Sequence, residues 1–326
     1  MKEQELTAFL HSRYGFLLML AASMAGTVTA YFAGDISPLT GNTGFGLPSA
    51  NEWITGRGLS LGINLALNIG IAGTMLYMNR RFNIIRSVSM LFAGIFLIMQ
   101  GALPSLMGQL YDGTLICFVV MLAVIPFFTT FQRPDRTRRI FLTFCLLSFG
   151  SLTDYAYAAY ILAFLIGTFQ MQCFTLRGLL ASLIGIIVPY WIMWGFGVIT
   201  LDSFTVPEFV SIFKALDTRE IALILVYTGI NLFLGMGFGI FNIIKIYGYN
   251  ARTRAYNGFW IVLSLVTVLL VIADYSHLVI YLPMLNCCTA IQIGHFFTIN
   301  NMLRSYIAIL SVIAVYAMLY IWNIAI

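Results

Sequence analysis

Apolar runs long enough to cross a lipid bilayer follow one another along almost the whole chain. A membrane-spanning helix needs about 20 mostly apolar residues, with a range of roughly 17–25. We therefore predict an all-α, polytopic transmembrane bundle of about eleven spans, or ten if the short run at 140–152 is re-entrant. The runs lie at 14–33, 58–78, 87–103, 113–131, 140–152, 155–171, 178–199, 220–244, 257–273, 277–297 and 303–324.

The composition excludes most other classes of protein. Of the 326 residues, 60% are hydrophobic and 9% are charged, whereas a soluble domain is about 25% charged. So few charges cannot cover a soluble surface, which excludes a soluble enzyme, a secreted disulfide scaffold, a disordered chain and a nucleic-acid-binding module. No soluble domain interrupts the runs. Residues 1–326 are predicted to form one integral membrane domain in contact with lipid, with no cofactor and no metal.

The basic residues predict how the chain is oriented. With the N-terminus in the cytoplasm and all eleven runs crossing, 14 of the 17 Lys and Arg residues fall on the inner side. Lys and Arg concentrate in cytoplasmic loops of membrane proteins. Removing 140–152 as a crossing would move several arginines to the outer side. We therefore predict an N-in, C-out topology.

Two outer loops are long. The loop at 34–57 is rich in Gly, Pro, Ser, Thr and Asn, and unpatterned connections of this length are usually functional or disordered. The loop at 201–219 contains a short segment near 204–216 whose apolar residues fall on one helical face. We predict an amphipathic helix there, lying in the outer interface.

Nine of the twelve acids fall on the predicted outer side. Three of them, Asp112, Asp154 and Asp274, directly precede runs that enter the membrane. A carboxylate in this place caps unpaired backbone N–H groups and meets the positive end of the helix dipole. Capping alone explains most of the pattern. The alternative is an acidic site at the outer mouth of the bundle.

Asp274 and His277 form the most suggestive local pair. Their i, i+3 spacing places them on one face of a helix. A carboxylate that holds an imidazole is a general base or a proton relay. A helix cap beside an interfacial histidine is the plainer interpretation.

The first long loop supplies three more candidates. Asp35 and Glu52 are candidate catalytic acids, and Arg57 is an outer cation that breaks the positive-inside rule. Paired hydrogen bonds from such a cation suit a lipid pyrophosphate or a sugar phosphate. Contact with lipid headgroups is the alternative. Asp112 and Asp154 are candidate substrate-binding groups at the neighbouring helix mouths.

The predicted spans contain amides but no charged residue at their centres. Asn64 and Asn68 share a helix face, and Gln100 lies in another span. Polar residues in spans usually form hydrogen bonds with neighbouring helices. The alternative is that Asn64 and Asn68 line a substrate cavity. Gly235 and Gly239 form a GxxxG pair, which suits close helix contact.

Aromatic side chains gather toward the outer ends of two spans. An aromatic belt at the membrane interface is the default interpretation, and a platform for stacking sugars is the alternative. The residues are Tyr155, Tyr157, Tyr160, Trp191 and Trp194.

Residues 102–196 carry a resemblance to known membrane proteins. The stretch contains ALPSLMGQLYDG, an arginine-rich loop, the hairpin FLTFCLLSFGSLTDYAYAAYILAFLIG, and RGLLASLIGIIVPYWIMWG. It resembles an uncharacterised multipass family of Bacteroidota and, more distantly, integral-membrane glycan polymerases and GT-C-type glycosyltransferases. The resemblance implies a bacterial inner membrane, a polyprenyl-phosphate-linked sugar as partner, and catalytic residues on outer loops.

Two kinds of function remain open at this point. The first is handling of a lipid-linked saccharide or envelope glycan at the outer face, with Asp35 or Glu52 as base and Arg57 as phosphate anchor. The alternative is a small-molecule transporter or flippase whose cavity is lined by Asn64 and Asn68, or a non-catalytic subunit of an envelope complex.

Overall fold

The chain folds as a bundle of α-helices. A computed structural model describes residues 2–33, 46–85, 87, 89–104, 108–133, 135–203, 216–246, 248–299 and 305–325. These ranges contain no strand. Their helices are α1 (Lys2–His11), α2 (Arg13–Ala33), α3 (Arg57–Phe82), α4 (Leu91–Gly101), α6 (Asp112–Phe128), α7 (Arg136–Ser151), α8 (Tyr157–Gln170), α9 (Leu176–Gly195), α10 (Thr218–Ile246), α11 (Ala251–Ala273), α12 (Leu278–Ile299) and α13 (Ser305–Ala325), with 3₁₀ turns η1 (Ala50–Glu52), η2 (Leu201–Ser203) and η4 (Tyr275–His277).

Seven helices in the described part of the chain are long and apolar enough to cross a membrane. They are α2, α3, α9, α10, α11, α12 with η4, and α13. Helices α4, α6 and α8 are apolar but shorter. The prediction of an all-α, multi-span membrane protein is thereby confirmed. The count of eleven spans and the topology stay predictions. The segment predicted as an interfacial helix lies almost wholly outside the described residues.

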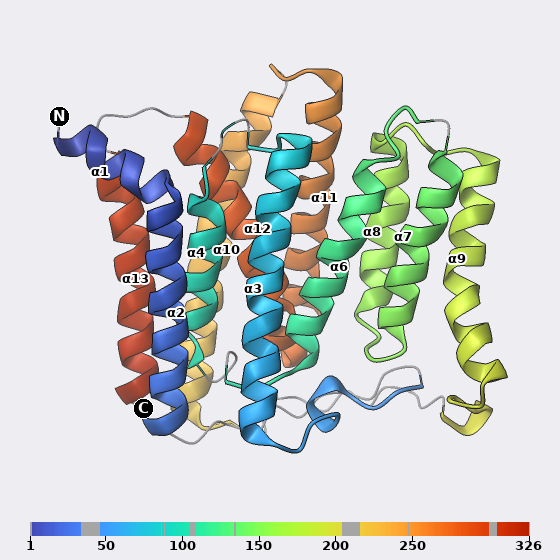
Figure 1. The fold of residues 1–326 in the computed structure, drawn as a ribbon, viewed down its shortest axis with the longest axis horizontal. Coiled ribbons are helices and arrows are strands. Elements are labelled where there is room, and N and C mark those ends of the chain that lie inside the picture. Colours follow the sequence, from blue (N-terminus) through green and yellow to red (C-terminus); the bar gives the residue numbers. More distant parts are fainter. Residues whose placement is uncertain are drawn as a thin grey trace.

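Helix α12 occupies the centre of the bundle. All of its hydrophobic window is buried, whereas the windows of the other six long helices are 22–44% buried. Helices α4, α6, α10 and α11 pack around it, and Figure 1 shows it behind α3 in the middle of the molecule. A helix that is apolar on all sides belongs in such a position.

The amides in the predicted spans bind one another between helices. Gln100 Nε2 donates to Asn68 Oδ1 at 2.7 Å, and Asn286 Nδ2 donates to Gln100 Oε1 at 2.6 Å. These contacts join α3, α4 and α12 through side chains that are almost fully buried. The prediction of hydrogen bonds between helices is confirmed here, because each amide meets a partner in the apolar interior.

The aromatic residues assigned to an interfacial belt divide into two groups. Trp191 and Trp194 of α9 are 66% and 51% exposed, as a belt requires. Tyr157 and Tyr160 are fully buried. The belt prediction is wrong for these two tyrosines, because α8 turns them into the bundle rather than toward its surface.

The two ends of the bundle differ in charge. The connection from α6 to α7 carries Arg133 and leads into Arg136 at the first turn of α7. Figure 1 places this connection at the upper end of the molecule. The described part of the first long loop, the turn between α7 and α8, and the connection between α11 and α12 all lie at the lower end. The lower end holds the candidate site.

Candidate functional site

Asp274 is the centre of a hydrogen-bonded cluster at the lower end of the bundle. It follows the last residue of α11, and its side chain is 16% exposed. Its Oδ1 lies 2.7 Å from His277 Nδ1, and its Oδ2 accepts the hydroxyls of Tyr155 at 2.8 Å and Tyr281 at 2.7 Å. Both carboxylate oxygens are therefore used by side chains rather than by a helix terminus. The prediction that Asp274 caps a helix is wrong.

This environment favours the ionised form of Asp274. Burial alone would raise the pKa of the carboxyl group. The hydrogen bonds from His277, Tyr281 and Tyr155 outweigh burial and lower the pKa below its usual value. A carboxylate bound to Nδ1 also fixes the imidazole tautomer that leaves Nε2 as the basic nitrogen. The pair therefore has the arrangement of a general base and its orienting group.

Asp154 lies within electrostatic range of this cluster but has a different environment. Its side chain is fully buried in the turn between α7 and α8. Oδ1 accepts the backbone N–H of Ala156 at 2.7 Å. Ala156 precedes the first residue of α8, which has no side-chain cap, so this bond closes the turn before the helix and the predicted capping role is wrong for Asp154. Oδ2 is buried and has no hydrogen-bond partner among the described residues.

The surroundings of Asp154 favour its neutral form. Burial is the main cause and the charge of Asp112 adds to it, raising the pKa of Asp154 to about 8. The charge of Asp274 acts in the same direction, while His277 acts against it. Asp154 and Asp274 are therefore neighbouring acids whose pKa values are displaced in opposite directions. Such a division is typical of a general acid paired with a general base.

Asp112 fastens the first long loop to the bundle. It is buried at the start of α6, where its Oδ2 accepts the hydroxyl of Ser49 and its Oδ1 accepts the backbone N–H of Ala50 at 2.9 Å. Nearby, the N–H of Leu47 donates to the carbonyl of Leu152 at 2.9 Å. The carboxylate thus binds a different segment instead of its own helix, so its predicted capping role is wrong. The loop is held against the turn that contains Asp154.

The three candidates of the first long loop have different positions. Glu52 is exposed in η1, near enough to Asp112 to influence it electrostatically. Arg57 is exposed at the start of α3, with its guanidinium 5.7 Å from the centre of the Tyr31 ring. That distance suits a cation–π contact. Asp35 lies outside the described residues.

A cavity of about 420 Å³ opens beside Asp274. Tyr155, Tyr275 and Tyr281 contribute to its wall together with Ser276. Aromatic rings and hydrogen-bonding groups around a concave surface are typical of sites for small organic ligands. Carboxylate, hydroxyl and ring surfaces together suit a polyhydroxylated ligand such as a sugar.

Asn64 and Asn68 lie elsewhere. Both are buried, and neither lines this cavity or the two cavities described further below. Asn68 also donates to the carbonyl of Asn64 at 2.9 Å. The described contacts of Asn68 therefore serve to join helices, and they place this side chain in the interior of the bundle.

Two of the residues that contact Asp274 or Asp112 were partly recognisable from the sequence, and one was not. Tyr281 lies four residues after His277, so one helix face carries both. The aromatic pattern predicts an interfacial belt position for Tyr155, whereas its hydroxyl binds Asp274. Ser49 carried no signal, because only the folded chain brings it to Asp112.

Metal binding has no support in the part of the chain that the structure describes. There, no group of three or more His, Cys, Asp or Glu residues is arranged to hold a metal ion.

Comparisons with known proteins give no match: no family model, no curated protein and no solved structure matches this chain.

Proposed function

We propose that the protein handles a lipid-linked saccharide or envelope glycan at the outer face of a bacterial inner membrane, as a glycosyl-transferring enzyme. The observation that carries this proposal is Asp274 at the wall of a cavity, with the buried His277 bound to its Oδ1 and the buried carboxyl group of Asp154 in electrostatic range. Oppositely displaced carboxyl groups in one site suit acid–base chemistry.

The topology that we propose has eleven crossings, with the N-terminus inside and the C-terminus outside. Two features support it: 14 of the 17 basic residues fall inside, and the arginines before α7 lie at the opposite end of the bundle from Asp154. Reporter fusions after Arg136 and after Asp154 are expected to report opposite sides of the membrane. Fusions reporting the same side would contradict the topology.

The proposed reaction begins with an acceptor hydroxyl bound in the cavity. The carboxylate of Asp274, which lines the cavity, takes the hydroxyl proton, and His277 holds that carboxylate through its Oδ1. The hydroxyl oxygen bonds to the anomeric carbon of the donor, and the bond from that carbon to the lipid phosphate oxygen breaks. The phosphate leaves with the electron pair, and neutral Asp154 supplies a proton to it. We prefer Asp274, held by His277, to Glu52 as the candidate base, because the side chain of Glu52 is exposed to solvent.

Three variants test the function in a host whose chromosomal copy is deleted. Asp274→Asn, His277→Gln and Asp154→Asn are expected to reduce surface polysaccharide formation, because loss of acid–base catalysis costs on the order of 10²–10⁴-fold in rate. Asp202→Asn changes an exposed acid of η2 and serves as the control. Immunoblots of membranes would establish equal amounts of protein. Normal polysaccharide in all three variants would contradict the proposal.

The alternative of a transporter has less support. It requires a polar cavity lined by Asn64 and Asn68, whereas neither residue lines any of the three cavities and Asn68 binds Gln100. A purely structural subunit would tolerate all three substitutions described above, so the same experiment distinguishes it from an enzyme.

A further inference from the structure

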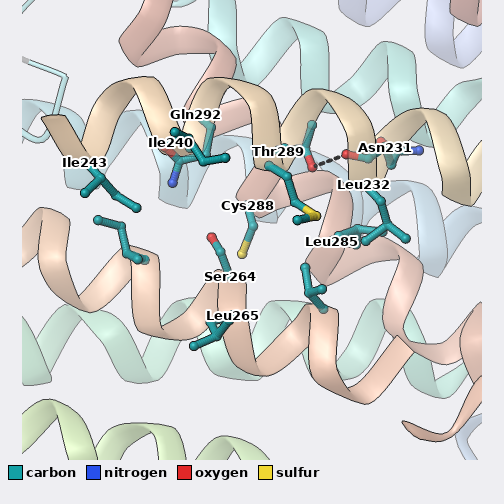
Figure 2. A pocket seen from close by; sticks show the side chains of 15 residues that line it. Asn231, Leu232, Ile240, Ile243, Ser264, Leu265, Leu285, Cys288, Thr289 and Gln292 are labelled. Atoms are coloured by element: carbon teal, nitrogen blue, oxygen red, sulfur yellow. Dashed lines mark hydrogen bonds between the residues drawn. The ribbon is translucent and has the colours of Figure 1, made fainter. Parts of the chain in front are cut away.

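A second concave region lies between α10 and α11, away from Asp274. Its deeper part is a cavity of about 190 Å³ with α12 as its floor (Figure 2). Its lining includes Gly235 and Gly239 of α10, Leu265 of α11 and Leu285 of α12. Branched aliphatic side chains and glycine make up most of the wall, so this part of the surface is apolar.

Another cavity, of about 340 Å³, continues this region toward the arginine-bearing end of the bundle. It is lined by Gln170, Arg254 and Gly258 among others. Ile243 and Ile261 line both cavities. The α11 residues along the two cavities are spaced three or four apart or adjacent, from 251, 254, 255, 258 and 261 to 264, 265 and 268. That spacing defines one helix face, so the two cavities form one groove.

The deeper part of this groove is open to the surroundings of the bundle. Met236, Ile240 and Leu265 line it and are 54%, 60% and 57% exposed. In a membrane protein, exposed apolar side chains at this depth face lipid hydrocarbon. Water is not stable in an apolar void. A hydrocarbon chain entering sideways from the bilayer is the occupant that suits this chemistry.

The other part of the groove is polar and carries a positive charge. Arg254 is exposed, and within the described part of the chain no ion pair or hydrogen bond is found for its guanidinium. Beside it, Oε1 of Gln170 is buried and lacks a hydrogen-bond partner among the described residues. As an acceptor it suits a hydroxyl group of the headgroup, whereas the phosphate itself requires the guanidinium. A guanidinium forms paired hydrogen bonds with a phosphate group. This part therefore suits an anionic headgroup.

We propose that the groove binds one anionic glycerophospholipid. Its phosphodiester lies at Arg254, and one acyl chain lies between α10 and α11, reaching Gly239 and Leu285. One lipid molecule would thus occupy both cavities, with its headgroup in the polar one and its acyl chain in the apolar one. This accounts for a polar and an apolar space on the same face of α11. This site lies at the other end of the bundle from the proposed sugar site and does not depend on it.

Native mass spectrometry of the full-length chain in mild detergent tests this proposal, with phosphatidylglycerol and phosphatidylcholine of identical chains as probes. We expect the wild type to retain one phosphatidylglycerol. Arg254→Gln should weaken that binding about fivefold, the effect of one arginine near an anionic lipid. Gly239→Leu should abolish binding of both lipids, because its side chain fills the groove. No atom lies within 4 Å of a Cβ at Gly239, so the variant should still fold.

Two matched variants serve as controls. Gly237→Leu adds the same side chain to the same helix, also in open space, but outside the groove. Arg177→Gln removes an exposed arginine at the start of α9. Both should bind phosphatidylglycerol as the wild type does. The proposal would be overturned if Gly239→Leu bound lipid as the wild type does, or if the wild type bound the two lipids with equal affinity. Retention of a polyprenyl phosphate in place of phospholipid would overturn it as well.

Discussion

The imidazole Nδ1 of His277 lies 2.7 Å from Oδ1 of Asp274, across the single 3₁₀ turn that joins α11 to α12. The other carboxylate oxygen receives hydroxyls from two more segments, the start of α12 and the turn before α8. The pair is therefore fixed by three parts of the chain at once. A proton acceptor held in this way is oriented before any substrate binds.

Tyr281→Phe should weaken the fold in a pH-dependent way. The substitution keeps the ring but removes a hydroxyl that donates to Asp274. A hydrogen bond to a charged group contributes about 1.5–3 kcal/mol, so the free energy of unfolding should fall by up to that amount at pH 7. Unfolding of purified wild type and variant at several pH values would measure the difference.

The sign follows from the lowered pKa of Asp274 in the folded state. Stabilisation by an ionised carboxylate is present above its unfolded pKa of about 3.9 and is lost as the pH falls through the folded value. The effect of Tyr281→Phe should therefore shrink in strong acid. Tyr77→Phe, at an exposed tyrosine of α3, should have no such effect. An effect of Tyr281→Phe that is equal at every pH would contradict this account.

Asp154→Asn should remove a different pH dependence. The folded pKa is about 8, whereas the unfolded value is about 3.9. The folded state therefore holds this proton more tightly, and the wild type loses stability as the pH rises from about 4 to about 8. Asparagine keeps the shape of the side chain without a charge. The melting temperature of the variant should stay nearly constant over that range and exceed that of the wild type at pH 8.

Scanning fluorimetry between pH 5 and pH 8.5 would measure both melting curves. Asp202→Asn, which changes an exposed acid, should retain the wild-type slope. If Asp154→Asn also retained that slope, the buried carboxyl group would have to be ionised already at pH 5.

The amide chain across the bundle predicts a large cost for one apolar substitution. Gln100→Leu removes the partner of both Asn68 and Asn286. Each buried group left without a hydrogen bond costs about 1–3 kcal/mol. We expect a lower melting temperature, and replacing Asn68 by Leu in the same chain should cost less than the sum of the two single changes. Gln132→Leu, near the surface, is the control. Strictly additive costs would contradict the proposed coupling.

The apolar runs predicted the helices well but not their ends. The run at 58–78 became α3, which extends to Phe82 through Arg80 and Arg81. Likewise α11 begins at Ala251, six residues before the predicted run at 257–273. Hydropathy marks the part of a helix that suits lipid. It does not register polar turns at the ends, which continue the same backbone hydrogen bonds.

The site was predictable only where its contacts are local. The spacing of Asp274 and His277 is enough to place them on one turn. Tyr155 precedes Asp274 by 119 residues, and no local sequence pattern predicts a contact over such a separation. The same reason explains Asp112: its position before a helix predicted a cap, but the loop residue Ser49 competes for the carboxylate once the chain has folded.

Gly113 sets how closely α6 approaches α12 beside the proposed site, which yields a last prediction. A Cβ at this position would lie 2.6 Å from the backbone oxygen of Ile280 and 3.1 Å from its Cα. Backbone atoms cannot turn aside as a side chain does, so Gly113→Ala should push the helices apart and displace the neighbouring Asp112 and Tyr281. We expect a lower melting temperature together with loss of polysaccharide formation. Gly237→Ala, where no atom lies within 4 Å of a Cβ, should change neither. Wild-type stability and activity in Gly113→Ala would mean that the two helices are not held at this distance.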